Sequence, residues 1–307
     1  MWRYLAYRVT GMGPIILGVT LIVFIVGRLA PGDPVQILFG DISNPVAEAR
    51  ARAQLGLDKP LPLQYLRFLV HVARFDLGTS YAYPGIRVGT VVRQALPVSL
   101  VLGILALAVA VLLGVPLGTL AALHPRSGID QAVRFFTLLG IAVPFFVVAV
   151  GLVLLFSLRL RWFPVSGWGH PAHVVLPVVV LMLRPMAYIT RITRLAVLQT
   201  LGQDYIRTAR AKGLTPWTIT SRHALRNASI TIITTVGLAL SLAFTGAFVT
   251  EVIFGIPGMG RATVTAILQR DYPVIQAVVM LYTAMFLLLN LLTDVAYAVL
   301  DPRVRYE

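Results

Sequence analysis

The sequence contains no cysteine and little charge. Only 12% of its 307 residues are charged, whereas soluble domains carry about a quarter of their residues as charges. The absence of cysteine excludes disulfide frameworks, thiolate zinc sites and cysteine nucleophiles. Because 58% of the residues are hydrophobic, the composition also excludes an ordinary soluble domain and a disordered chain. The chain is therefore predicted to be a membrane protein.

The sequence also lacks the motifs of common catalytic and metal sites. It has no GxxxxGK[ST] phosphate loop, no HExxH pair and no GxSxG elbow. The glycine cluster at 255–260 lacks GxGxxG spacing and indicates a turn. His170 and His173 are three residues apart beside Pro171, which is more typical of an interfacial loop than of a metal site. We therefore expect a non-catalytic chain that binds no cofactor or metal of its own.

Long apolar runs dominate the sequence. About 20 apolar residues in a helix cross a hydrocarbon core about 30 Å thick. Six runs meet this length. The first is not expected to be a secretory signal, because its apolar stretch is too long and no cleavage site follows it. The predicted spans are residues 9–29, 98–123, 135–158, 174–194, 229–253 and 274–297.

The distribution of Lys and Arg predicts the orientation. Cytoplasmic loops of membrane proteins are enriched in these residues. One set of connections holds most of them: Arg3, Arg8, Arg126, Arg134, Arg191, Arg194, Arg207, Arg210, Lys212, Arg222, Arg226, Arg303 and Arg305. The opposite short loops hold only Arg159, Arg161, Arg261 and Arg270. Both termini are thus predicted to be cytoplasmic, and topology explains the net charge of +14 without a nucleic-acid partner.

Three regions follow from the spans. Residues 1–29 form the cytoplasmic N-terminus and first anchor. Residues 30–97 are rich in turn formers and contain a helical pattern at 63–75, which indicates an extracytoplasmic cap between the first two spans. Residues 98–307 form the core with the remaining spans.

The cytoplasmic stretch at about 200–228 has the signals of a short isolated helix. Asp204 is a favourable N-cap, Gly213 suits a left-handed C′ position, and Pro216 prevents continuation. A helix of this length needs packing to be stable. Its small and basic residues fit either a helix docked in a partner's groove or a connector lying on anionic lipid. The pattern alone leaves both readings open.

This stretch resembles the ATPase-coupling loop of ABC-transporter permeases, in particular the dipeptide/oligopeptide branch. The resemblance lies in YIRTARAKGL at 205–214 and RHALRNA at 222–228. Further similar motifs run along the chain: LAPGDP at 29–34, LGLDKP at 55–60, QY at 64–65, DLGTS at 76–80, EVIFGIPGMG at 251–260, DYP at 271–273, NLLTD at 290–294 and LDPRVRY at 300–306. The general permease pattern has Glu-Ala-Ala where this chain has Arg207-Thr208-Ala209, so no contact is carried over from that glutamate.

The resemblance implies an all-α integral membrane protein with six transmembrane helices and the type I ABC importer permease fold. It implies one half of a translocation pathway in a prokaryotic inner or plasma membrane. The implied partners are a homologous second permease forming a heterodimer, two cytoplasmic ATPase subunits that bind the ATP and Mg²⁺, and an extracytoplasmic solute-binding protein. The implied ATPase contacts are Asp204, Tyr205, Arg207, Thr208, Ala209, Arg210, Ala211, Lys212, Gly213 and Leu214.

Polar residues within the spans are candidates for function, because charge is costly in a membrane. Arg184 lies about 15 Å into its span, near the midplane, and is predicted to face the translocation path or a buried acidic partner. Ser241 and Thr245 are weaker pathway candidates. Glu251 and Asp294 fall near opposite interfaces and, with Pro257 and Gly258, are expected to have helix-end structural or gating roles.

Two other classes of function and several solutes stay open. An ion-coupled carrier or channel would need acidic residues at midplane depth, and an intramembrane enzyme would need a convergent polar pair. The sequence shows neither. Similar permeases are associated with dipeptides, oligopeptides, glutathione, nickel and some sugars, and selectivity is expected mostly in the binding protein. Short peptides are the predicted substrates.

Overall fold

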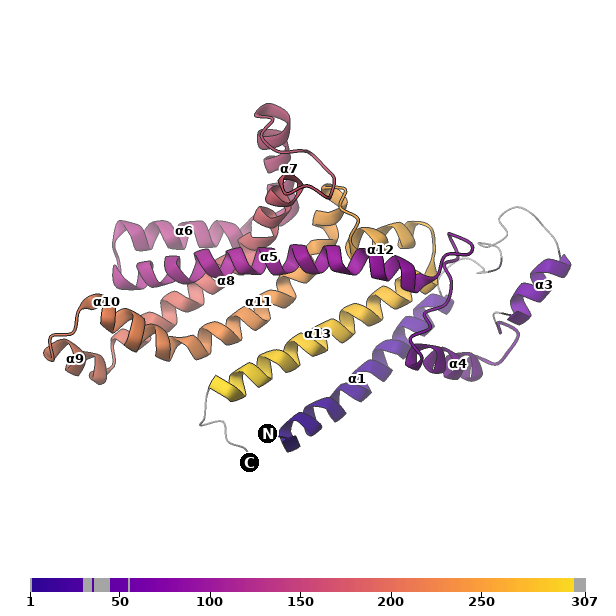
Figure 1. Cartoon of the computed structure of the whole chain (residues 1–307), viewed down its shortest axis with the longest axis horizontal. Helices are drawn as coiled ribbons and strands as arrows, with labels where there is room; N and C mark the ends of the chain where they lie inside the picture. Colours follow the sequence, from indigo (N-terminus) through magenta and orange to yellow (C-terminus); the bar gives the residue numbers. More distant parts are fainter. Residues whose placement is uncertain (1, 30–34, 36–44, 55, 301–307) are drawn as a thin grey trace. The chain divides into compact units, whose positions relative to one another are not determined.

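The structure is a computed structural model that describes residues 2–29, 35, 45–54 and 56–300. Side chains are not described at 2–7, 9, 28, 51, 54, 241–246, 294 and 296–300. Helices make up the regular structure of the described residues, apart from an isolated antiparallel bridge between Thr79 and Arg87 (Figure 1). The helices are α1 (Trp2–Leu29), α3 (Pro45–Gln54), α4 (Leu61–Ala73), α5 (Val88–Leu123), α6 (Gly128–Ala142), α7 (Phe145–Leu152), α8 (Ala172–Leu201), α9 (Asp204–Ala211), α10 (Pro216–Thr218), α11 (Leu225–Ile253), α12 (Met259–Leu268) and α13 (Tyr272–Leu300). Two π-helical segments, η1 (Val153–Arg159) and η2 (Ile219–Ala224), follow α7 and α10.

The apolar runs coincide with long helices. Among the described residues, α5, α8 and the segments Thr10–Gly27 of α1 and Tyr272–Thr293 of α13 are long and apolar enough to cross a membrane. The pair formed by α6 with α7–η1 would add a fifth span if it counts as one crossing. The span predicted at 229–253 is helical as α11, in which the side chains at 241–246 lie outside the described part.

The span predicted at 135–158 is not one continuous helix. α6 and the α7–η1 helix meet at an angle of 100°. Val143 has extended backbone angles (φ −78°, ψ 124°) and precedes Pro144. Proline disfavours helical geometry in the residue before it and has no N–H to continue the helix. The apolar run was continuous in sequence, so its length concealed this break.

The chain divides into two compact units, and α5 and α13 belong partly to each. The first comprises residues 1–98 and 257–287. Here α4 confirms the helix predicted at 63–75, and it packs on α1 with the Phe24 and Tyr65 rings 5.3 Å apart. Buried apolar residues of α5, α12 and α13, among them Val88, Met259 and Val278, form its core.

In this first unit, Asp271 anchors the turn that precedes α5. The carboxylate is 1% exposed. It accepts a hydrogen bond from the Ser80 hydroxyl and one from the Tyr81 N–H at 3.1 Å. Two of the sequence motifs, DLGTS and DYP, therefore meet at this carboxylate.

The second unit comprises residues 99–256 and 288–307. α8 packs against both α6 and α11 (Figure 1). Ala110 of α5, Ile189 of α8 and Ala239 of α11 form a cluster that is fully or almost fully buried. Gly118 permits close approach of α5 to α8, because a Cβ there would lie 2.5 Å from the Thr190 carbonyl oxygen. This helical bundle carries the segment from α9 to η2 at one end.

Candidate functional site: a surface segment and an intramembrane cavity

The short helix α9 is defined by its C-terminal cap. Gly213 has φ +76°, in the left-handed region that glycine adopts without strain. Its N–H donates to the Arg210 oxygen at 2.9 Å, and the Leu214 N–H donates to the Ala209 oxygen at 3.3 Å. This pair of bonds is a Schellman motif. The left-handed conformation expected at Gly213 is confirmed.

The beginning of α9 differs from the prediction. Gln203 is the N-cap and forms no capping hydrogen bond with its side chain, so the prediction of Asp204 as N-cap is wrong. Asp204 is instead the first helical residue, and its carboxylate lies 3.3 Å from the Arg207 guanidinium. A carboxylate in the first turn is still favourable, because the N-terminal end of a helix carries partial positive charge.

α9 rests on a small apolar base. Ile206 and Ala209 are buried against Ile219 of η2, and Leu201 at the end of α8 packs against this cluster. The side-chain amide of Asn227 on α11 donates to the Tyr205 hydroxyl at 2.7 Å. These contacts fix a helix that is too short to be stable alone in water.

Every other residue of α9 and the turn after it is exposed. The exposed residues from the predicted contact set are Asp204, Tyr205, Arg207, Thr208, Arg210, Ala211, Lys212, Gly213 and Leu214. Trp217, which sequence reasoning missed, is 77% exposed at the start of α10. We call residues 204–217 the coupling segment, after the role that the sequence resemblance predicts for it. It presents basic and aromatic side chains together, a composition typical of the centres of protein interfaces.

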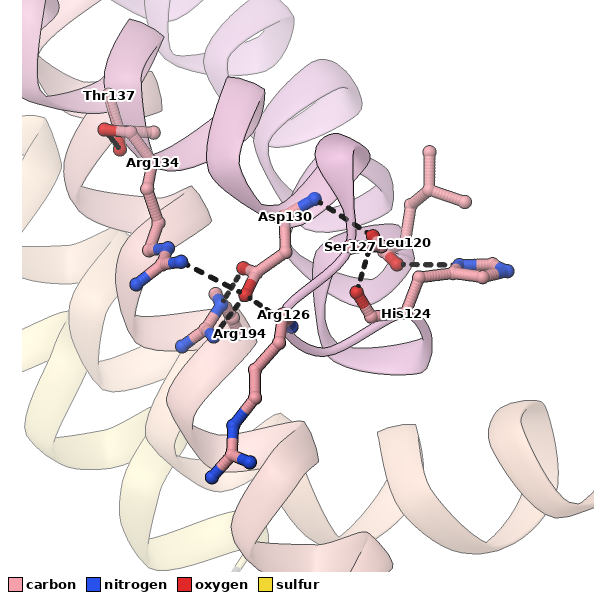
Figure 2. Close-up of polar contacts among 8 residues, drawn as sticks. All are labelled: Leu120, His124, Arg126, Ser127, Asp130, Arg134, Thr137 and Arg194. Atoms are coloured by element: carbon pink, nitrogen blue, oxygen red, sulfur yellow. Dashed lines mark hydrogen bonds and ion pairs between the residues drawn. The ribbon is translucent and has the colours of Figure 1, made fainter.

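A buried ion pair lies near the α5–α6 turn (Figure 2). The Asp130 carboxylate of α6 is fully buried and accepts from Arg194 of α8 at 2.5 Å (Nε to Oδ1) and 2.8 Å (Nη2 to Oδ2). The backbone N–H of Arg126 donates to it at 3.0 Å, and Arg134 lies 3.5 Å away. Sequence reasoning missed this site. Ser127-x-x-Asp130 before an apolar run is a capping-box pattern that could have indicated it.

Arg184 lines a cavity of about 630 Å³, which is also lined by residues of α6, of α7 and of the bend between them. Its side chain is exposed in the chain, and within the described residues it forms no hydrogen bond or ion pair. The acidic partner considered for it is thus not among the described residues. Ser241 and Thr245 are on α11, but their side chains lie outside the described part, as does that of Asp294 on α13.

The remaining predicted residues lie at helix ends. Glu251 is fully buried near the end of α11 and accepts from the Ser99 hydroxyl of α5 at 2.6 Å. Gly258 is the N-cap of α12, and Pro257 is exposed just before it. In the described part of the chain, no group of three or more His, Asp or Glu could hold a metal ion.

Comparison with known proteins identifies the family. The model for binding-protein-dependent transport system inner membrane components matches residues 114–306, and the model for the N-terminal region of such components matches residues 1–86. The chain belongs to this family. It is therefore a multi-pass inner membrane component and a non-catalytic permease subunit, which implies ATPase and binding-protein partners.

Curated relatives and solved structures agree with this assignment. The chain is 40% identical to the dipeptide transport system permease protein DppB of Bacillus subtilis (strain 168), over 99% of this chain and 98% of that protein. It is 37% identical to the probable peptide ABC transporter permease protein y4tP of Sinorhizobium fredii, over the whole length of both. An inward-facing structure of the MetNI methionine ABC transporter matches 69% of this chain and 96% of its own, with 15% identity and a TM-score of 0.59. The last likeness confirms the type I importer permease fold predicted from the motifs.

Proposed function

We propose that this permease forms one half of the pathway by which an ATP-driven importer carries short peptides across the membrane. The support is the full-length similarity to curated permeases whose names state dipeptide or peptide transport. The other half would come from a homologous second permease, and two ATPase subunits would supply ATP hydrolysis. Both termini would face the cytoplasm, in line with the Lys and Arg bias.

The coupling segment is the proposed contact with the ATPase. The observation that carries this proposal is the contrast within α9: Ile206 and Ala209 fix the helix from beneath, while the rest of the helix is exposed. A helix held rigidly by its own chain loses little entropy when a partner binds it, and it can transmit a rigid-body movement. Arg207, Arg210 and Lys212 would meet carboxylates of the partner, and Trp217 would fill an apolar pocket.

Reconstitution in proteoliposomes tests the function. The permease, purified with its partner subunits and supplied with binding protein, should import labelled trialanine only when ATP is present. The chain alone should neither import the peptide nor hydrolyse ATP. ATP-independent uptake by the chain alone would contradict the proposal and favour a carrier. If the transporter imports nickel or glutathione but does not import trialanine, the peptide assignment is contradicted.

Cross-linking tests the docking surface and the topology together. A cysteine can be placed at Arg210 in this cysteine-free chain without a competing thiol. It should cross-link to the ATPase subunit in membranes, whereas a cysteine at the exposed Trp162 after η1 should not. Labelling of the Arg210→Cys variant by an impermeant maleimide from outside intact cells would contradict the cytoplasmic placement.

A further inference from the structure

The cavity beside Arg184 lies where a membrane helix is broken. α6 ends at Ala142, α7 begins at Phe145, and the two residues between them also line the cavity. α8 forms the other wall. The volume of the cavity, about 630 Å³, lies within the range of about 300–1,000 Å³ typical of ligand sites. Its surface is mainly apolar, with contributions from Phe136, Leu139 and Met186.

Arg184 brings a positive charge to the cavity. Arg184 is the charged residue of the cavity lining and lies near the middle of the 30-residue helix α8. Charge in a membrane-spanning segment is costly and is usually paired or faces a cavity. A carboxylate bound in the cavity would remove this cost by forming charge-assisted hydrogen bonds with the guanidinium. The first N–H groups of α7, at Phe145 and Phe146, have no acceptor within the described residues and also favour an anion.

The end of α6 brings carbonyl oxygens to the cavity. The Val143 N–H donates to the Leu139 oxygen, and the next residue, Pro144, has no N–H. The carbonyls of Gly140, Ile141 and Ala142 consequently receive no backbone hydrogen bond in the part of the chain that is described. All three residues line the cavity. A helix C-terminus carries partial negative charge, so these carbonyls favour an ammonium group.

The wall of the cavity also includes a buried hydroxyl. Thr190 lines the cavity and is 1% exposed, and its Oγ1 atom has no hydrogen-bond partner among the described residues. Buried polar atoms are almost always paired, and leaving one unpaired is costly. Thr193, one turn further along α8, has an unpaired Oγ1 as well, but it does not line the cavity. The Oγ1 atom is itself buried, so a bound peptide group would reach it only after the Thr190 side chain rotates.

We propose that this cavity is a binding site for a short peptide in its zwitterionic form during import. Arg184 and the N-terminal N–H groups of α7 receive the carboxylate, the carbonyls that end α6 receive the ammonium, and the apolar wall accepts side chains. This site rests on the proposed peptide-import function and assigns its substrate a place in this chain. A phosphatidylethanolamine headgroup carries the same pair of charges, so lipid is the competing source of this chemistry.

Equilibrium binding of radiolabelled trialanine tests the site. The assembled transporter, without binding protein, is placed in nanodiscs of phosphatidylglycerol, and N-acetyl-trialanine and trialanine amide serve as competitors. Both derivatives should compete at least about tenfold more weakly than trialanine, the factor for one charge-assisted interaction. Arg184→Gln should weaken trialanine binding about tenfold and abolish the difference between free acid and amide, whereas Arg184→Lys should retain that difference. Arg191→Gln, two turns along α8 and outside the cavity lining, is the matched control and should bind as wild type.

Several results would overturn the site. These are the absence of saturable binding to wild type, equal competition by the derivatives, unchanged binding in Arg184→Gln, or displacement of trialanine when phosphatidylethanolamine is added. A measurement of ATP-driven uptake distinguishes failure of the proposed binding site from failure of the proposed peptide-import function. If wild type imports trialanine while the binding results fail, the cavity assignment alone is wrong. If wild type imports no peptide, the proposed function itself is wrong.

Discussion

Arg194 on α8 binds Asp130 on α6 through two hydrogen bonds, and the Asp130 carboxylate is completely buried. The same carboxylate accepts from the Arg126 N–H, where the chain turns with a positive φ of 63°. A single buried group therefore joins the α5–α6 turn to the helix that leads into α9. This connection ties the base of the coupling segment to the body of the bundle.

Removing one partner of this ion pair should destabilise the permease. Breaking a buried pair leaves an uncompensated charge and costs about 3–5 kcal/mol. We expect Arg194→Gln to lower the melting temperature in detergent markedly, measured by the loss of the monodisperse peak after heating. Arg134→Gln is the matched control, because Arg134 is half exposed and 3.5 Å from the carboxylate, and it should change little.

The double variant Asp130→Leu with Arg194→Met distinguishes the cost of an uncompensated buried charge from the loss of the hydrogen bonds that the pair makes. Apolar replacement of a whole buried pair is often neutral or stabilising. The double variant should therefore be more stable than either single variant. If it is as unstable as Arg194→Gln, the pair is needed for its hydrogen bonds to the turn at Arg126 rather than for charge balance.

The sequence predicted the long helices because a run of apolar residues is a property of the sequence alone. α1, α5, α8 and α13 follow from run length, and α4 follows from its helical spacing. The turn at Gly213 was equally predictable, because glycine adopts without strain the left-handed conformation that ends a helix, and Pro216 follows it closely in sequence. These features depend on neighbours in the chain.

Features that depend on contacts between distant segments were missed. In the sequence, Arg194 served only to predict the orientation in the membrane, because nothing near it in sequence indicates an ion pair with Asp130. The bend at Val143-Pro144 was concealed by continuous hydropathy, although the proline was a visible signal. The position of Arg184 within an apolar run was visible in the sequence, but the cavity beside it is lined by residues of that bend and was not predictable. Local patterns thus gave the elements, and the sites came from their packing.

Trp217→Ala should weaken binding of the ATPase without unfolding the permease. Trp217 is 77% exposed in this chain, so its truncation removes almost no internal packing. Tryptophan at the centre of an interface often contributes 2 kcal/mol or more, or about a 30-fold change in affinity. Co-purification of the ATPase subunit and the apparent affinity for added ATPase measure the effect.

The control for this prediction is Trp162→Ala, since Trp162 is 65% exposed after η1 and outside the coupling segment. It should leave ATPase binding unchanged. Equal loss of binding in both variants would indicate a general fold defect, and no loss in Trp217→Ala would remove this residue from the interface.

Gly213→Val should uncouple ATP hydrolysis from import. No atom lies within 4 Å of a Cβ at this position, so the substitution meets no steric neighbour. Its cost comes from the left-handed φ of +76°, which a β-branched residue adopts only with strain. We expect the last turn of α9 to shift and import per ATP hydrolysed to fall at least several-fold. Gly213→Asn should be milder, because asparagine tolerates this conformation. Identical coupling ratios in Val, Asn and wild-type proteins would exclude a role for this cap.

Asp271→Ala should loosen the turn that precedes α5. The carboxylate accepts from the Ser80 hydroxyl and from the Tyr81 N–H, and its loss leaves these donors without their acceptor. Tyr83 is linked to the same turn, because its N–H donates to the Ser80 hydroxyl oxygen at 2.9 Å. We therefore expect faster proteolysis and faster amide hydrogen exchange at residues 78–87 in Asp271→Ala. Asp58→Ala, an exposed carboxylate before α4, should leave both rates unchanged. If exchange at 78–87 is as slow in Asp271→Ala as in wild type, the turn is held by its bridge between Thr79 and Arg87 instead.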